Sequence, residues 1–353
     1  MEFWHLVNQM KKNNKEFLLY GFLEAENVLF VIENLEIKIK GCVDDDPFIY
    51  KKTSRYGEIL SFLDLTKSGV QANYNYIIGI DYAISIRNRL LEAGVPQNQI
   101  LWLNTGKLGN CWVNNPTFMV DHYNEFKENL AIFSDEKSQM QYWGMCCFRM
   151  DFNEARLEQL NINAYNQYFD EIVCLTQDEV FVDIGAYDGK TIQKFMSYVK
   201  GQYKKIFAIE ASTRNMQLMK ARLKEYSHIE YLQYAVLDTD IGGVSLNGDC
   251  GANSKIDLRT GDIPTNSLDN LINEKVTFIK MDIEGAEMKA LEGMKGIIKQ
   301  YRPKLAISIY HSSEDMLLIP QLFKRLCENY DFNFRQHAEG IGEYICYAIP
   351  KEL

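Results

Sequence analysis

The sequence has no excess of basic residues, since its 38 Lys and Arg stand against 48 Asp and Glu and give a formal net charge of −10. A surface that binds nucleic acid or an anionic membrane needs clustered Lys and Arg, so we expect neither partner. No apolar run approaches the ~18 residues of a membrane-spanning helix, so no span is predicted. A small basic pocket remains compatible with this charge.

Signals for secretion and for disulfides are also missing. The N-terminal stretch MEFWHLVNQMKKNNKEF has no basic segment followed by a long apolar one, unlike a secretory signal. The eight cysteines form no CxxC pair and stand in apolar surroundings, and the adjacent Cys146 and Cys147 are poorly placed for one metal ion. We therefore expect buried, reduced thiols and a cytoplasmic location.

The order of strand-like and helix-like segments predicts an α/β protein of about two domains in 353 residues. Residues 1–112 alternate both kinds, which predicts a smaller Rossmann-like domain with a parallel sheet. Residues 113–176 are aromatic and polar and predict a mostly helical connector, with helices in 123–133 and 135–142. Residues 177–353 alternate again, and their last two strands leave no room for a helix, so they form an antiparallel hairpin.

The predicted elements share apolar runs for strands and amphipathic spacing for helices. In the first domain the strands are 17–21, 37–43, 76–80 and 100–103, and the helices are 22–34 and 85–93. In the last domain the strands are 180–183, 205–210, 230–236, 277–282, 305–310, 332–336 and 344–349, and the helices are 190–200, 213–226, 286–298 and 316–327.

The stretch VFVDIGAYDGKTI at residues 180–192 places an acid and two glycines between a buried strand and a helix. The spacing from Asp183 through Gly185 to Gly189 does not match the G-x-G-x-x-G turn that brings backbone amides to a pyrophosphate. A carboxylate would repel pyrophosphate but suits the ammonium and sulfonium of S-adenosylmethionine. The predicted contacts of this cofactor are Asp183, Gly185, Ala186, Tyr187, Asp188 and Gly189.

A second carboxylate follows the next strand, where KIFAIE ends in Glu210. A carboxylate at this place accepts hydrogen bonds from both ribose hydroxyls, although NAD-binding folds share the feature. The alternatives are a solvated strand-end acid for Glu210 and a helix N-terminal acid for Asp183. The predicted cofactor contacts continue with Glu210, Ala211, Ala235, Val236 and Asp282.

Together these motifs resemble the FkbM family of S-adenosylmethionine-dependent methyltransferases. Further matching stretches are QYF at 167, AIEAS at 208, YAVLD at 234, PTNSLDNL at 264, FIKMDIEGAEMKALEG at 278 and GEYICYAIP at 342. The resemblance implies a class I methyltransferase fold, a doubly wound sheet closed by the antiparallel C-terminal hairpin. It also implies O-methylation of a hydroxyl on a small-molecule acceptor, often a sugar, glycan or polyketide-type product.

The first domain resembles the Rossmann-like module that precedes some bacterial FkbM-type domains, and its CVDDDP stretch fits that pattern. The turn from Gly21 through Phe22 and Leu23 to Glu24 leaves little space for a phosphate, so we expect no dinucleotide there. We expect docking, substrate presentation or dimerisation, which would make the protein a homo-oligomer through this domain.

The candidate catalytic residues follow two later strands, whose carboxyl ends meet at the binding crevice. Asp282 and Glu284 follow one strand and His311 follows the next. Either acid could act as base, bind substrate hydroxyls or hold Mg²⁺ or Ca²⁺, but a metal is not favoured because no third ligand is evident. We expect His311 to be a general base, with a structural histidine as the alternative. Glu287 favours the N-terminus of its helix or joins the site.

Two other function classes stay open. A non-catalytic scaffold that retains the fold conflicts with the intact set Asp183, Gly185, Gly189 and Glu210. A nicotinamide-dependent oxidoreductase requires a pyrophosphate loop, and neither domain contains one. Residues 240–261, rich in Gly, Asn, Ser and Asp, predict a lid, a substrate loop or a solvated hairpin.

Overall fold

The computed structural model describes residues 2–21, 32–33, 35–45, 53–54, 56–79, 83–103, 115–151, 155–158, 160, 166–247, 255–257, 261–338, 340 and 342–351. The chain divides into two compact units. The first comprises Met1–Cys111, Phe152–Glu158 and Glu339–Ile341, and the second comprises Trp112–Asp151, Gln159–Ala338 and Gly342–Leu353.

The first unit contains a six-stranded sheet in the order β3-β4-β2-β1-β5-β6. Its strands are β1 (Phe17–Tyr20), β2 (Ile39–Val43), β3 (Thr53–Ser54), β4 (Gly57–Leu60), β5 (Asn75–Ile78) and β6 (Ile100–Trp102). The helices of this unit include α1 (Glu2–Lys12), α3 (Phe62–Lys67), α4 (Ala83–Glu92) and α8 (Ala155–Glu158). All neighbouring strands run parallel except β3 and β4. The expected Rossmann-like sheet is confirmed, and the hairpin of β3 and β4 was not predicted.

The acidic run after β2 is bound within its own unit. Asp45 accepts a hydrogen bond from the Tyr20 hydroxyl at 2.5 Å and forms an ion pair with Arg89 at 2.5 Å. Asp46 and most of the helix predicted at 22–34 lie outside the described residues, as do the side chains of the predicted turn after Gly21.

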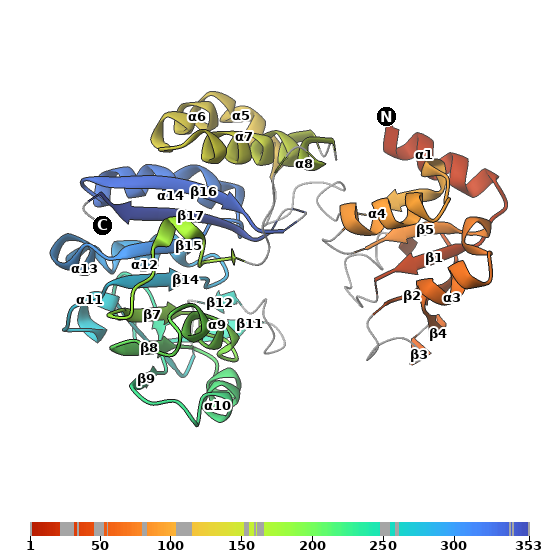
Figure 1. Ribbon diagram of the computed structural model, residues 1–353. Coiled ribbons are helices and arrows are strands. Elements are labelled where there is room, and N and C mark those ends of the chain that lie inside the picture. Colours follow the sequence, from red (N-terminus) through yellow and green to blue (C-terminus); the bar gives the residue numbers. More distant parts are fainter. Residues whose placement is uncertain are drawn as a thin grey trace. The chain divides into compact units, whose positions relative to one another are not determined.

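The second unit contains a seven-stranded sheet in the order β16-β17-β15-β14-β7-β8-β9, which Figure 1 shows from top to bottom. Its strands are β7 (Val180–Ile184), β8 (Lys205–Ile209), β9 (Ile229–Leu232), β14 (Phe278–Met281), β15 (Lys304–Ser308), β16 (Tyr330–Gln336) and β17 (Tyr344–Pro350). Strand β17 runs antiparallel to β15 and β16, while the other pairs are parallel. The predicted doubly wound sheet with its C-terminal hairpin is confirmed.

A smaller sheet of the order β10-β13-β11-β12 lies in the same unit. Its strands are β10 (Ala235–Val236), β11 (Gly243–Asn247), β12 (Lys255–Asp257) and β13 (Ile263–Asn266). The single strand predicted at 230–236 is therefore split, because β9 and β10 join different sheets. Described parts of the region 240–261 form the antiparallel pair β11 and β12, as the hairpin alternative expected.

Most helices of the second unit occupy the expected places, but α5 and α11 were not predicted and one predicted helix is divided. The helices are α5 (Pro116–Asp121), α6 (Tyr123–Glu128), α7 (Glu136–Asp151), α9 (Lys190–Tyr198), α10 (Thr213–Arg222), α11 (Leu268–Leu271), α12 (Glu287–Glu292), α13 (Lys295–Tyr301) and α14 (Ser313–Leu326). The helix predicted at 286–298 is wrong as one element, because it breaks at Gly293. A Cβ there would lie 2.0 Å from the Leu237 carbonyl oxygen, so the chain passes too closely for any other residue. Among the residues described, every helix is too short or too polar to cross a membrane.

An aromatic stack holds α9 against the centre of the large sheet. Phe181 of β7 stacks with Phe195 of α9 at 4.4 Å and with Phe278 of β14 at 5.1 Å between ring centroids. All three side chains are fully buried. Burying a side chain of this size stabilises the fold by roughly 1.5–3 kcal/mol, so this cluster anchors the strands that carry the site.

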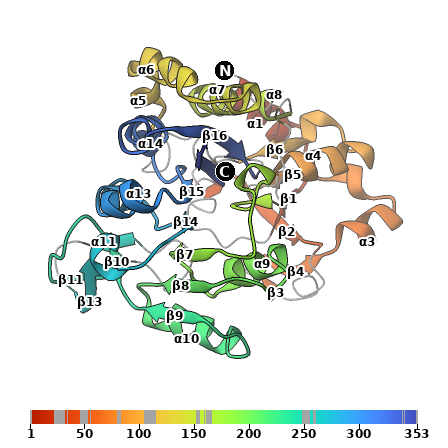
Figure 2. The ribbon, with the colours of Figure 1, turned by 60° about the vertical axis from the view of Figure 1, so that its left-hand side comes forward.

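The helical segment α5 to α7 covers the β16 edge of the sheet, as Figure 2 shows. Asp135, just before α7, accepts hydrogen bonds from the Ser138 amide at 2.6 Å and from Arg335 of β16 at 2.8 Å. Burial raises the pKa of Asp135, but the contacts with Arg335 and Ser138 outweigh it and lower the pKa to about 2. The charged carboxylate therefore joins α7 to the sheet at neutral pH.

Asp135→Asn keeps a good helix-capping side chain but removes the charge. Because Asp135 is 37% exposed, we discount for solvent screening and expect a loss of about 1 kcal/mol at pH 7, or about 2–4 °C in Tm. A carboxylate with a lowered folded pKa stabilises above its unfolded pKa and loses that effect on acidification. The Tm difference should therefore shrink from about pH 4 to pH 2 in thermal unfolding by circular dichroism. Asp331→Asn, on the exposed part of β16, is the control; a pH-independent difference would contradict the assignment.

Candidate functional site

The turn after β7 needs both of its glycines for packing inside the protein. Gly185 has φ +77°, and a Cβ there would lie 1.9 Å from the Asp282 carbonyl oxygen. Gly189 has φ +83°, and a Cβ there would lie 3.0 Å from Met219 and 3.1 Å from Leu223. The sequence predicted these glycines because a cofactor would approach the backbone closely, and that reason stays a prediction. The contacts with Asp282, Met219 and Leu223 explain both glycines without a cofactor.

Backbone amides of this turn point into the protein. The amides of Gly185 and Ala186 donate to the Ile209 carbonyl at 2.9 and 3.0 Å. The amide of Tyr187, a residue with a left-handed φ of 48°, donates to Glu210 at 2.9 Å. These three groups are therefore occupied and form no cradle for a pyrophosphate, in contrast to the turn of a dinucleotide site.

The acids Glu210 and Asp188 both hold this turn in place. The second oxygen of Glu210 accepts the Ser212 amide at 2.8 Å, so the carboxyl bridges the ends of β7 and β8. Asp188 forms an ion pair with Arg222 of α10 at 2.8 Å, and Arg222 also donates to the Asp188 carbonyl at 2.7 Å. Both acids are largely buried, so Glu210 is not the solvated strand-end acid of the alternative interpretation.

The other predicted cofactor contacts differ in their exposure. Tyr187 is exposed and Ala211 is half-buried, so both have surface available to a ligand. Ala186, Ala235 and Val236 are buried. Their predicted contacts with a cofactor stay predictions.

Asp183 forms a buried ion pair with Lys280, its register partner on β14. The Lys280 ammonium lies 2.9 Å from Asp183 Oδ1, and the side chains are 3% and 0% exposed. Lys280 also donates to the Gly185 carbonyl at 2.8 Å. Burial opposes the charge on Lys280, but Asp183 outweighs it and raises the pKa of the ammonium group. The cation that faces Asp183 is therefore part of the protein, whereas the sequence predicted a cation of the cofactor.

Asp282 follows β14 and accepts hydrogen bonds from two tyrosines. The Tyr168 hydroxyl donates at 2.6 Å and the Tyr310 hydroxyl at 3.1 Å. Burial raises the pKa of Asp282, but the contact with His311, the charge of Lys280 and the Tyr168 hydroxyl hold it well below the usual range. The side chain is 21% exposed. Asp282 is thus an anion that solvent or a ligand can reach.

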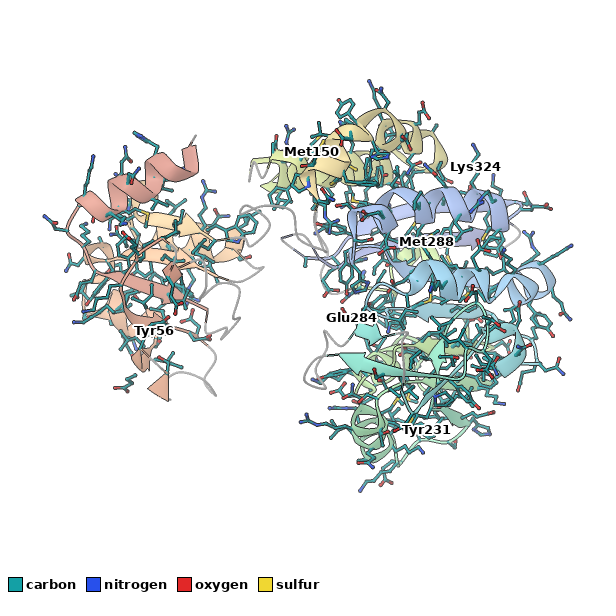
Figure 3. All side chains as sticks on the ribbon, turned by 180° about the vertical axis from the view of Figure 1, so that it is seen from behind. Tyr56, Met150, Tyr231, Glu284, Met288 and Lys324 are labelled. Carbon is teal, nitrogen blue, oxygen red and sulfur yellow. The ribbon has the colours of Figure 1, made fainter. Side chains whose placement is uncertain are left out.

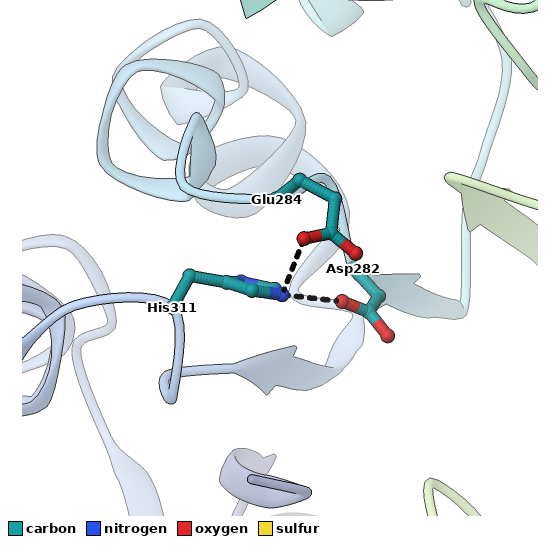
Figure 4. Close-up of side chains that lie close together, drawn as sticks. All are labelled: Asp282, Glu284 and His311. Carbon is teal, nitrogen blue, oxygen red and sulfur yellow. Dashed lines mark ion pairs between the residues drawn. The ribbon is translucent and has the colours of Figure 1, made fainter. Parts of the chain in front are cut away.

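His311 lies between carboxylates on both sides of its ring. Its Nδ1 is 2.9 Å from Glu287, and its Nε2 is 3.2 Å from Asp282 and 3.6 Å from Glu284. Figure 4 shows the latter two carboxylates converging on one ring nitrogen. Burial lowers the pKa of His311, but the charge of Glu287 and the contact with Asp282 raise it well above the usual value. A raised pKa favours the protonated imidazole, which opposes the predicted role of a general base; that role stays a prediction.

Glu284 comes from the turn between β14 and α12 and lies at the margin of the second unit, where Figure 3 labels it. Its backbone has a left-handed φ of 58°, a conformation that a residue with a side chain seldom adopts. Burial raises its pKa to about 7, although the charge of His311 opposes the rise. The side chain is 19% exposed, so it shares the reachable side of the site with Asp282.

Glu287 begins α12 and is fully buried. Its two oxygens accept the amides of Ile283 and Gly285 at 2.8 and 2.9 Å, and one of them faces His311 Nδ1. The side chain therefore shapes the turn that carries Glu284 and orients the imidazole. The N-terminal charge effect that we considered for this residue describes only part of its role.

Lys280, Tyr168 and Tyr310 complete the site; the sequence placed Tyr310 at the same strand end as His311 but indicated no role for Lys280 or Tyr168. The signal for Lys280 was a charged residue inside the apolar stretch FIKM, which requires a buried partner. Tyr168 precedes the sheet, and its ring lies 5.2 Å from the Lys280 ammonium. Nothing in its local pattern indicates that it returns to the end of β14.

Gly185→Ala tests the close approach of β7 and β14. Gly201→Ala is the matched control, because Gly201 also has a positive φ, +73°, but has open space where a Cβ would lie. The control should lose about 1 kcal/mol from backbone strain, and Gly185→Ala about 3 kcal/mol or more, because steric overlap adds to the strain. Urea unfolding of both variants measures this; equal losses would contradict it.

Comparisons with known proteins bear on the second unit and on the fold. Residues 183–334 match the family model of the methyltransferase FkbM domain. A crystal structure of methyltransferase FkbM from Methylobacillus flagellatus KT is similar over 98% of each chain, with 19% identity and a TM-score of 0.70. This likeness supports the fold.

More distant structures match only part of the chain. An rRNA methylase from Streptococcus thermophilus matches 51% of this chain and 92% of its own, with 15% identity and a TM-score of 0.35. The structure of SMU.1697c from Streptococcus mutans in complex with SAH matches 50% and 93%, with 11% identity and a TM-score of 0.34. None of the curated proteins matches the chain. Residues 183–334, which lie in the second unit, are thus identified by the family model as a methyltransferase FkbM domain.

Proposed function

We propose that the protein transfers a methyl group from S-adenosylmethionine to a hydroxyl of a sugar or glycan-type acceptor. The turn after β7 carries the cofactor part of this proposal, because its amides at Gly185, Ala186 and Tyr187 are occupied within the protein. A nicotinamide dinucleotide needs such amides for its pyrophosphate, while S-adenosylmethionine has no phosphate. The oxidoreductase alternative is therefore disfavoured.

The charges beside the turn suit a cationic cofactor. Lys280 neutralises Asp183 inside the sheet, so the reachable anion next to the turn is Asp282. The main chain of Asp282 passes so close to Gly185 that a Cβ on residue 185 would collide with the Asp282 carbonyl oxygen. An anion here favours a sulfonium or ammonium group. Glu210, at the end of β8, would bind the ribose hydroxyls through the lone pairs that its two amide contacts leave over.

The acceptor chemistry follows from the same edge of the sheet. The acceptor oxygen attacks the methyl carbon, and the carbon–sulfur bond breaks with its electron pair left on a neutral thioether. The hydroxyl proton must leave, and Asp282 and Glu284 are the carboxylates that a ligand can reach. Carboxylates and tyrosine hydroxyls also suit the many hydroxyls of a sugar. His311 positions the two acids.

The first unit supports an accessory role. Asp45, an acid that follows β2, forms an ion pair with Arg89 and accepts a hydrogen bond from the Tyr20 hydroxyl. A carboxylate bound in this way is not free to hold a ribose. We keep docking, substrate presentation or dimerisation as the proposed role of this unit.

Glu210→Gln tests the cofactor. Isothermal titration with S-adenosylhomocysteine should show one site per chain, and the variant should bind it roughly 10–100-fold more weakly, because a charge-assisted hydrogen bond to ribose is lost. Glu230→Gln, on the neighbouring strand β9 and half exposed, should bind like the wild type. Binding of NADH in place of S-adenosylhomocysteine would overturn the proposal.

Asp282→Asn tests the acceptor step. With labelled S-adenosylmethionine and a panel of neutral sugars and glycans, label should enter base-stable material, as expected of a methyl ether. At saturating S-adenosylmethionine the variant should lower kcat by about 100–10,000-fold, and it should also weaken binding of S-adenosylhomocysteine, because Asp282 is the anion proposed to face the cationic part of the cofactor. Release of the label as methanol in base would indicate a methyl ester and contradict a hydroxyl acceptor.

A further inference from the structure

We propose that Asp282, Glu284 and His311 form a binding site for one divalent metal ion. The sequence offered two carboxylates and no third ligand, and the third comes from the end of the neighbouring strand β15. One ligand atom of each residue lies within 4.8 Å of the others. Use of the ion in methyl transfer rests on the proposed function, whereas its binding does not.

The spacing of the ligand atoms fits one ion. Ligands at about 2.1 Å from a metal lie about 3.0–3.4 Å apart at octahedral or tetrahedral angles. His311 Nε2 is 3.2 Å from Asp282 Oδ1 and 3.6 Å from Glu284 Oε2. Shifts of a few tenths of an ångström would therefore bring all three atoms to one metal.

The buried imidazole is aimed at this site. His311 is 3% exposed, and neither ring nitrogen makes an aligned hydrogen bond with any described residue. Nδ1 faces Glu287 at 2.9 Å, which leaves Nε2 directed at Asp282 and Glu284. When one ring nitrogen of a histidine binds a metal ion, the other commonly donates its N–H to a carboxylate, and Glu287 is in the place of that carboxylate here.

The charges also favour a dication. The carboxylates of Asp282, Glu284 and Glu287 surround a single imidazole. A divalent metal ion would displace the Nε2 proton to solvent. The ion carries two positive charges where the proton carried one, so it would balance the three carboxylates better. Because Asp282 and Glu284 are 21% and 19% exposed, the ion has access and water can complete its coordination.

Two oxygen ligands and one nitrogen ligand suit Mn²⁺, which accepts carboxylate, water and imidazole. In the methyltransferase the ion would bind the acceptor hydroxyl, make its proton more acidic and hold the oxygen toward the methyl group. A vicinal diol of a sugar offers two oxygens to such an ion, so the inference favours that acceptor class.

The test uses full-length protein freed of metal with EDTA and titrated with Mn²⁺, with free Mn²⁺ measured by electron paramagnetic resonance. One Mn²⁺ should bind per chain, and Glu284→Gln and His311→Gln should each weaken binding at least 10-fold. Glu287→Gln should weaken it about 10–100-fold through the orientation of the imidazole. Glu230→Gln is the control and should bind like the wild type.

Absence of binding by the wild type up to about 1 mM, or binding unchanged in Glu284→Gln and His311→Gln, would overturn the site. Circular dichroism checks that the variants fold; if His311→Gln does not, Glu284→Gln decides, because Glu284 is partly exposed. Titration with S-adenosylhomocysteine in EDTA separates the two proposals. Cofactor binding without Mn²⁺ binding would refute only the metal site, and the reverse would refute only the cofactor.

Discussion

The buried ion pair of Lys280 and Asp183 joins the two central strands of the sheet, and the site is built on this pair. Lys280 also binds the Gly185 carbonyl, so one ammonium group holds both β14 and the turn after β7. Loss of either partner would leave a buried charge alone, a change that destabilises proteins by roughly 3–5 kcal/mol. The same contact brings Gly185 so close to the main chain of Asp282 that only glycine fits.

With Asp183 neutralised, the remaining acids divide into two groups. Glu210 and Glu287 accept backbone amides and shape the turns, so their charges are used for structure. Asp282 and Glu284 have side chains that are 21% and 19% exposed, so a ligand can reach them. Opposing environments of neighbouring carboxyl groups are typical of catalytic sites, because such sites need one acid held charged and another able to exchange a proton or a ligand.

Most strands were predictable, because each is a short apolar run bounded by polar residues. The errors arose where distant parts of the chain meet. The helix predicted at 286–298 ends at Gly293, where the Leu237 carbonyl oxygen lies too close for a Cβ. The surroundings of His311 could not be predicted either, because Glu287 and Asp282 come from other elements and raise its pKa from both sides of the ring, while its role as a base stays a prediction. A pKa depends on neighbours, and neighbours from another strand are not visible in local sequence.

By itself, the sequence determined the resemblance of its second domain to the FkbM family, the order of most strands and helices, and the presence of carboxylates at strand ends, because these depend on local patterns and motif spacing. Only the tertiary structure decided the partners: Lys280 for Asp183, Tyr168 for Asp282, and two carboxylates for the Nε2 of His311. The reason is physical. Parallel strands bring their carboxyl ends to one edge of the sheet, so residues far apart in the chain share charge and hydrogen bonds across a few ångströms.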